Sequence, residues 1–369
     1  MIFREVSRAS GRLKKLAQDV NQIVFTIIAV VGLICCLPQV GYTVADSDLS
    51  ESDYNRVSKQ LALLVVHEDY EAAIAIADSV MQALPGHPYG PLLKATVLNS
   101  RSIDFEDNLD IAELKRLCDQ VDLQVGEILS HQAPTARLYF FQGIILTYRV
   151  MAVGNSESRY RALKYGLRAL EYFEDAVALD STFWDAYYGL GMIMYFKSEK
   201  AGILRSIGLV ADNRSEGKEY VELAAARGSL AALPAQNSLA WMSFLSGDYD
   251  SAEKYCDRLL EQYPGRRSFF WCKAKIEKEK CEWADAIVTY QQLLAMIKSQ
   301  TRNNHYNEIG ILHSLALSNY NLERWEEVVK YADEAFAIEA KPEIVDRKKK
   351  DFQNLTRMRR KAQKMIENN

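Results

Sequence analysis

Residues 247–264 read GDYDSAEKYCDRLLEQYP, and residues 280–294 read KCEWADAIVTYQQLL, so the second stretch repeats the first at a spacing of 34 residues. In each copy an aromatic residue is followed three positions later by an alanine, Ala252 or Ala286, and apolar residues follow four and seven positions beyond it. This spacing lies along one face of a helix. A fixed period of this length predicts stacked copies of one helical unit.

Further copies of the pattern occur along the chain. In each copy the quoted pattern forms the second helix of a hairpin, and a first helix precedes it. Good copies cover residues 54–87, 184–229, 233–266, 267–300 and 309–342, with a stretched copy at 136–183. The pattern resembles the tetratricopeptide repeat family, whose unit is a helix-turn-helix of 34 residues with small residues at the tightest helix contacts. The resemblance implies an all-α solenoid of about five to seven hairpins.

Composition agrees with a helical, ordered chain. Hydrophobic residues make up 49% and charged residues 25%, while 8 Pro and 18 Gly in 369 residues are too few for a turn-rich β protein. The formal net charge of -4 argues against nucleic acid as a partner, because phosphate binding needs a concentrated positive field.

The N-terminus has the pattern of an export signal. A basic opening is followed by an uncharged run at 23–37, closed by Pro38. This run is shorter than the roughly 20 residues of a membrane span, so we predict a signal peptide over residues 1–45, cleaved before Asp46. An uncleaved membrane anchor is the alternative. Either reading predicts an exported or membrane-associated protein, at the periplasm or outer-membrane periphery, or anchored in the inner membrane.

The remaining chain divides into three predicted regions. Residues 46–135 hold one repeat and a degenerate helical region with an acidic loop at 104–110, and residues 136–342 form the solenoid. Residues 343–369 read as a basic capping helix, with a surface for an acidic partner or anionic membrane as the alternative. A polar extension at 299–307 is expected to be exposed.

The residues give no sign of catalysis. The sequence contains no P-loop, no GxSxG elbow and no HExxH, and the five histidines are scattered over separate units. We therefore expect no enzyme activity, no cofactor and no metal. Cys256 reads as a small core residue, and a disulfide from Cys272 to Cys256 or Cys281 is the alternative.

The resemblance also implies a binding surface, because the first helices of successive repeats line the concave face in this family. The residues that would face inward are Tyr188, Met192, Tyr195, Asn237, Trp241, Phe244, Trp271, Lys275, His313 and Tyr320. Such an aromatic surface suits an apolar or aromatic segment of a partner protein, or a lipid-like chain. The alternative is that tight curvature closes the groove and these rings form a second core.

A Trp-led hairpin is followed by a loop with ADNRSEG at 211–217 and by two close repeats with FFWCKAKIEKEKCEW at 269–283 between them. In this arrangement, residues 160–340 resemble the tetratricopeptide repeat protein 39 family and related bacterial outer-membrane repeat proteins, which implies an envelope setting. The sequence therefore predicts a non-catalytic scaffold or adaptor of the cell envelope that binds a protein or peptide partner. An accessory factor for membrane assembly or transport, which binds lipid or apolar segments, is the second hypothesis. An enzyme is the least favoured one.

Overall fold

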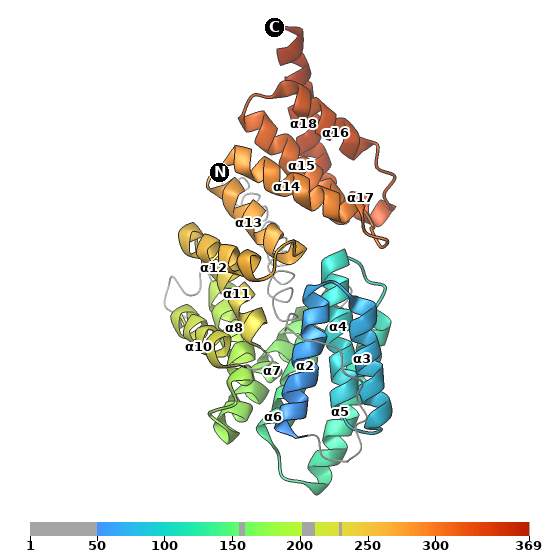
Figure 1. Cartoon of the computed structure of the whole chain (residues 1–369), viewed down its shortest axis with the longest axis vertical. Helices are drawn as coiled ribbons and strands as arrows, with labels where there is room; N and C mark the ends of the chain where they lie inside the picture. The colour runs from blue at the N-terminus through green and yellow to red at the C-terminus, as the bar shows by residue number, and fades with distance from the viewer. Residues whose placement is uncertain (1–49, 155–158, 201–210, 229–230, 369) are drawn as a thin grey trace, which may run out of the picture. The chain divides into compact units, whose positions relative to one another are not determined.

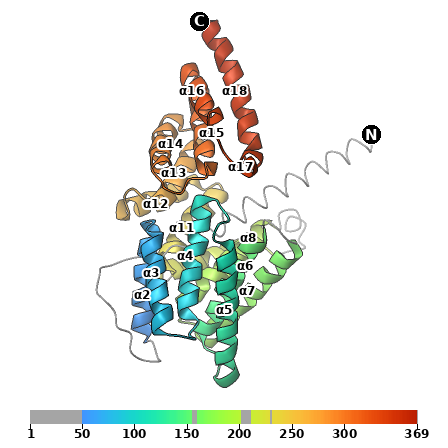
Figure 2. The same ribbon diagram turned by 90° about the vertical axis from the view of Figure 1, so that its right-hand side faces the viewer.

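A computed structural model describes residues 50–154, 159–200, 211–228 and 231–368, and the predicted signal or anchor at 1–45 lies outside them. All the regular elements of the described residues are helices (Figures 1 and 2). They are α2 (Glu51–Val66), α3 (Tyr70–Ala83), α4 (Tyr89–Phe105), α5 (Ile111–His131), α6 (Ala136–Gly154), α7 (Arg159–Leu179), α8 (Trp184–Lys200), α10 (Arg214–Arg227), α11 (Ala232–Leu245), α12 (Tyr249–Gln262), α13 (Arg267–Glu279), α14 (Trp283–Lys298), α15 (Tyr306–Asn321), α16 (Trp325–Phe336), α17 (Pro342–Arg347) and α18 (Lys349–Glu367).

The helices follow one another as hairpins, which confirms the predicted all-α solenoid fold. Each good copy of the template supplies a first and a second helix, as in the pair α13 and α14. The region at 88–135, which fits the template poorly, supplies α4 and α5. Among the described residues, no helix is long and apolar enough to cross a membrane.

The chain forms two compact units. Of the described residues, those within 50–103 and 109–238 form unit 1, and those within 104–108 and 239–368 form unit 2. The predicted boundary at residue 135 falls between α5 and α6, both in unit 1. The five-residue segment 104–108 is thus grouped with helices that lie far away in the sequence.

The structure supports the register that the repeat predicts. Ala73, Ala252 and Ala286 occupy the same template position in three second helices, and all three are fully buried. Seven residues further on, Leu259 and Leu293 are buried as well. Because interiors are packed near crystal density, the small side chain lets the backbones of neighbouring helices approach closely.

The hairpin turns repeat a local backbone geometry. In four hairpins the residue two positions before the second helix has a left-handed φ: 64° at Glu68, 82° at Gly247, 60° at Cys281 and 55° at Glu323. In two hairpins an aspartate follows and caps the second helix. The Asp248 carboxylate, for example, accepts a hydrogen bond from the Ser251 backbone N–H at 3.1 Å.

Glycines set the tightest contacts in unit 1. The ring of Phe173 on α7 lies against Gly143 of α6 and Gly189 of α8, where an added Cβ would come within 2.5 Å and 2.4 Å of ring atoms. Between helices α8 and α10, a Cβ added at Gly191 of α8 would lie 2.5 Å from the backbone oxygen of Gly217 on α10. These positions have no room for a side chain.

Unit 2 has a continuous apolar core that ends at the C-terminal helix. α18 packs against α15 and α16, as both views show (Figures 1 and 2). Leu355, Met358 and Ala362 are its buried residues, spaced along one face. The basic side chains of α18 therefore alternate with a buried apolar face, as in a capping helix.

The four described cysteines are free thiols. Cys118, Cys256 and Cys272 are buried, and Cys281 is exposed. The alternative of a disulfide from Cys272 is thus wrong, and Cys256 is the small core residue that the pattern predicts. Burial raises the pKa of the Cys272 thiol, and the neighbouring Cys256 adds to the rise.

Replacement of Gly191 by Ala should destabilise the protein by about 1–3 kcal/mol, because the new methyl group meets the backbone of α10. The matched control is Gly166→Ala on α7, where an added Cβ meets nothing within 4 Å. The control should be neutral or stabilising by up to about 1 kcal/mol, through helix propensity alone. Urea denaturation of both variants measures the difference, and equal stabilities would contradict the close approach of α8 and α10.

Candidate functional site

The predicted inward residues of unit 1 are buried. Tyr188, Met192, Tyr195 and Asn237 are each less than 5% exposed. The Tyr188 hydroxyl lies 3.0 Å from the hydroxyl of Ser238, and burial raises its pKa well above the usual value. This burial is the arrangement expected of packed rings.

The predicted residues of unit 2 keep more exposed surface. Trp241 is buried, whereas Phe244, Trp271, Lys275, His313 and Tyr320 are half-buried. The Lys275 Nζ lies 4.9 Å from the centre of the Trp241 ring. Burial and the nearby Lys278 lower the pKa of Lys275, so this face of α13 disfavours further positive charge.

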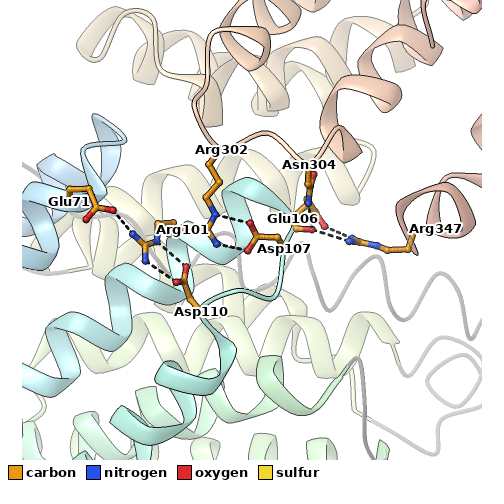
Figure 3. Close-up of polar contacts among 8 residues, drawn as sticks. All are labelled: Glu71, Arg101, Glu106, Asp107, Asp110, Arg302, Asn304 and Arg347. Atoms are coloured by element: carbon orange, nitrogen blue, oxygen red, sulfur yellow. Dashed lines mark hydrogen bonds and ion pairs between the residues drawn. The ribbon is translucent and has the colours of Figure 1, made fainter. Parts of the chain in front are cut away.

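Unit 2 also holds the acidic segment, which we define as residues 104–108 (DFEDN), through three arginines, of which Figure 3 shows Arg302 and Arg347. Arg302 binds both carboxylate oxygens of Asp107, with its Nε at 2.8 Å and its Nη2 at 2.5 Å. The other two pairs join Arg267 to Asp104 at 2.5 Å and Arg347 to Glu106 at 2.6 Å. Each carboxylate of the segment therefore faces its own guanidinium group.

Side-chain amides bind the backbone of the same segment. The Asn307 Nδ2 donates to the carbonyl of Asp104 at 2.9 Å, and the Asn304 Nδ2 donates to the carbonyl of Glu106 at 3.0 Å. The Arg347 Nη1 donates to that second carbonyl too, at 3.0 Å. Because α4 ends at Phe105, these are carbonyls of a helix C-terminus, which lack partners inside the helix and favour nearby cations.

Aromatic rings complete the site. The Arg302 guanidinium lies 5.1 Å from the centre of the Phe105 ring, in the segment itself. On the other side, the ring of Tyr306 lies 3.9 Å from Arg347 and 3.8 Å from the Lys348 Nζ. Such cation–π contacts fix the planes of the guanidinium groups. We call Arg267, Arg302, Asn304, Asn307 and Arg347 the receiving site.

The loop before α15 positions two members of the receiving site. Its residues 302–307 are half-buried, so the expectation that the extension at 299–307 is exposed is wrong for this part. The buried carboxylate of Glu308 accepts a hydrogen bond from Asn303 at 3.0 Å and lies 2.7 Å from the His305 Nδ1. The Asn304 Oδ1 accepts from the Tyr306 backbone N–H, an Asx turn that orients its Nδ2 toward Glu106.

The flanks of the acidic segment are closed inside unit 1. Arg101 on α4 binds Asp110, the residue before α5, through its Nε at 2.9 Å and its Nη2 at 2.8 Å (Figure 3). The same guanidinium reaches Glu71 on α3 at 2.7 Å. This bidentate pair draws together the two ends of the segment.

Sequence reasoning selected none of the receiving-site residues. It named Trp271 and Lys275 on α13, which share a helix face with Arg267 because the three are four residues apart. Two signals pointed to the site: the acidic loop at 104–110, and the run of Arg and Asn in the extension at 299–307. Each of these two stretches is visible on its own, but nothing in the sequence indicates that they contact each other.

Hollows also occur on the surface of the described residues. Two lie on unit 1, with volumes of about 590 Å³ and 460 Å³, and both include Asp122 and Arg149, which form an ion pair at 3.0 Å. No group of three or more His, Cys, Asp or Glu side chains that could hold a metal ion occurs among the described residues.

No protein-family model matches the chain, and no curated protein matches it. Solved structures do match, at low identity. The APC/C hetero-tetramer Cut9–Hcn1 gives a TM-score of 0.51 at 14% identity, over 77% of this chain and 46% of the other. A TPR repeat-containing protein from Cytophaga hutchinsonii (TM-score 0.41, 14% identity, 79% and 98%) and yeast Tom70 (0.37, 13%, 98% and 74%) also match.

The matched Cut9–Hcn1 chain is a tetratricopeptide repeat protein, and the likeness shows that this chain has the same kind of fold. The chain spans less than half the length of the matched Cut9–Hcn1 chain. Solenoids of this kind present extended surfaces that bind other proteins.

Burial raises the pKa of Glu106 above its ordinary value of 4.5, against the opposing effect of Arg347. The native state therefore holds the proton of Glu106 more strongly than the unfolded chain does. This contribution to stability is complete below pH 4.5 and is lost as the pH rises through the raised pKa. Glu106→Gln, which keeps an oxygen for Arg347, should remove this loss.

The difference in Tm between Glu106→Gln and the unchanged protein should accordingly grow as the pH rises from 4.5 toward neutrality. Glu326→Gln, on the exposed side of α16, is the control and should show no such trend. Calorimetry across this pH range measures both. A difference in Tm that shrinks with rising pH would contradict the assignment.

Proposed function

We propose that the protein is a non-catalytic scaffold whose unit 2 binds a segment of a partner protein. One observation carries the proposal: unit 2 already binds a protein segment, and it binds the backbone of that segment as well as its side chains. The contacts of Asn304 and Asn307 with main-chain carbonyls would be available to any helix end of suitable shape. A solenoid face with such donors is suited to capture of a partner segment.

We assign the partner contacts to the half-buried members of the predicted groove and to the receiving site. Trp271 and Lys275 continue the face of α13 that begins with Arg267, and they keep part of their surface exposed. Aromatic and arginine side chains are the groups that dominate protein interfaces. The buried Trp241, whose ring centre lies 4.9 Å from the Lys275 Nζ, would support this face.

A photo-crosslinking amino acid at Trp271 should form an adduct with one defined protein in intact cells. The control position is Val288 on α14, whose side chain is 55% exposed, and no such adduct should form there. The recovered protein, once purified, should bind the unchanged chain and lose roughly tenfold or more in affinity toward Arg302→Gln, because a charged hydrogen bond contributes about 1.5–3 kcal/mol. Equal adducts at both positions, or unchanged affinity, would overturn the proposal.

We place this scaffold in the cell envelope, at the periplasm or outer-membrane periphery, with an inner-membrane anchor as the alternative. The support is the basic and apolar pattern of residues 1–45, which matches a signal or anchor.

A surface on α7 supports a second candidate function, that of an accessory factor bound to an anionic membrane. Tyr160, Leu163 and Leu167 are 75%, 60% and 41% exposed, at the spacing of one helix face. Arg161, Lys164 and Arg168 flank them and are exposed as well. An apolar stripe beside cations is the composition of interfacial membrane-binding helices.

Vesicles of phosphatidylglycerol and phosphatidylcholine should bind the chain, whereas vesicles of phosphatidylcholine alone should not. The double variant Leu163→Gln with Lys164→Gln should weaken binding about fivefold or more, since each cation near such a surface contributes about 1 kcal/mol. Val288→Gln is the control for loss of an exposed apolar side chain. Co-sedimentation measures all three, and binding that is equal for both kinds of vesicle would rule out this function.

A further inference from the structure

We infer that the acidic segment is a resident competitor: the partner of unit 2 carries an acidic turn at the end of a helix and displaces residues 104–108 from the receiving site. This inference rests on the proposed function, because it names the chemistry of the partner and the regulation of the same site.

The charges of the site define what it accepts. Three guanidinium groups, those of Arg267, Arg302 and Arg347, meet three carboxylates within five residues. The side chain of Arg267 is 3% exposed, so it needs an anionic or hydrogen-bonding partner in any bound state. A segment without carboxylates would leave these cations unpaired, and the site therefore discriminates against neutral and basic segments.

The backbone contacts define the shape of the segment. The carbonyls that Asn307 and Asn304 bind belong to Asp104 and Glu106, two residues apart across the C-terminal end of α4. Glu106 has a left-handed φ of 53°, which turns the chain away from the helix axis. A partner therefore matches the site when acidic residues follow the last turn of a helix.

The mode of attachment favours exchange over permanent packing. Hydrogen bonds, ion pairs and the cation–π contact of Phe105 hold the segment, and the flanking Leu109 is 72% exposed. Residues Arg101 and Asp110 close the flanks of the segment by contacts within unit 1. Release of the acidic segment from the receiving site therefore leaves the ion pair of Arg101 and Asp110 intact.

Covalent attachment gives the segment its advantage over a partner. A tethered segment competes at an effective concentration that reaches the millimolar range for short connections. A partner in solution binds only to the fraction of molecules whose receiving site is open, and its apparent affinity falls by that fraction. Substitutions that weaken the binding of the acidic segment should consequently strengthen the binding of a separate partner molecule to the receiving site.

The probe for the test is a fluorescein-labelled peptide with the sequence of residues 101–110, RSIDFEDNLD. The segment is weakened by Asp107→Asn, which removes the carboxylate that Arg302 binds and leaves the buried pair of Arg267 and Asp104 in place. This variant should bind the peptide roughly tenfold or more tightly than the unchanged chain. A matched control, Asp53→Asn, makes the same change of net charge at an exposed ion pair of unit 1 and should not change the affinity for the peptide.

Two further variants identify the site of binding. Addition of Arg302→Gln to the weakened segment should abolish the gain in affinity. A peptide with Asn in place of Asp104 and Asp107 and Gln in place of Glu106 should not bind. In the unchanged chain, saturating acidic peptide should raise hydrogen exchange over residues 104–108, a readout that does not depend on any substitution.

The outcomes separate this inference from the proposed function. If the neutral peptide binds as tightly as the acidic one, or if hydrogen exchange of residues 104–108 does not change, the acidic competitor is wrong while partner capture at Trp271 can still hold. If a single-stranded oligonucleotide or anionic vesicles displace the segment as well as the peptide does, the assignment to a protein segment is wrong. If no adduct forms at Trp271, the proposed function is wrong. The peptide experiment would then show only that the receiving site binds the chain's own acidic segment.

Discussion

The close approach of helix backbones at one repeated small residue is the constraint on which the fold depends. Ala73, Ala252 and Ala286 are fully buried at this position, and the glycine pair of α8 and α10 takes the same principle to its limit. Where a large side chain does enter, as with Phe173, two glycines make room for it. The period of 34 residues follows, because each hairpin packs against the next one through the same surface by which the preceding hairpin packs against it.

This constraint explains why the fold was predictable from the sequence. Contacts between successive hairpins are local, so a residue such as Ala286 carries the same signal as Ala252 one period earlier. Turn geometry was less visible, since only Gly247 among the four left-handed turn residues is a glycine. The groove was only half predictable. Periodicity identifies the face of a first helix, but whether that face is covered depends on residues elsewhere, and Trp241 is buried while Trp271 is not.

The receiving site was beyond such reasoning for a physical reason. Arg302 and Asp107 are 195 residues apart, and Arg347 and Glu106 are 241 apart, whereas a repeat pattern relates only neighbouring units. A polar loop also predicts exposure when it is considered alone. Here residues 302–307 of the extension and 104–107 of the acidic loop are half-buried because each stretch supplies hydrogen-bonding partners to the other, and no property of either stretch encodes that pairing.

The two kinds of contact have different consequences for the molecule. Apolar seams such as the one at Ala286 gain free energy from burial itself, so the hairpins stay packed under all conditions that keep the chain folded. Ion pairs such as that of Arg302 and Asp107 contribute little net stability, because desolvation of both charges offsets their attraction. They contribute selectivity instead, since a wrong segment leaves a cation unpaired. A solenoid that fixes its helices by apolar contacts and holds one segment by charge has separated the part that must not move from the part that can be exchanged.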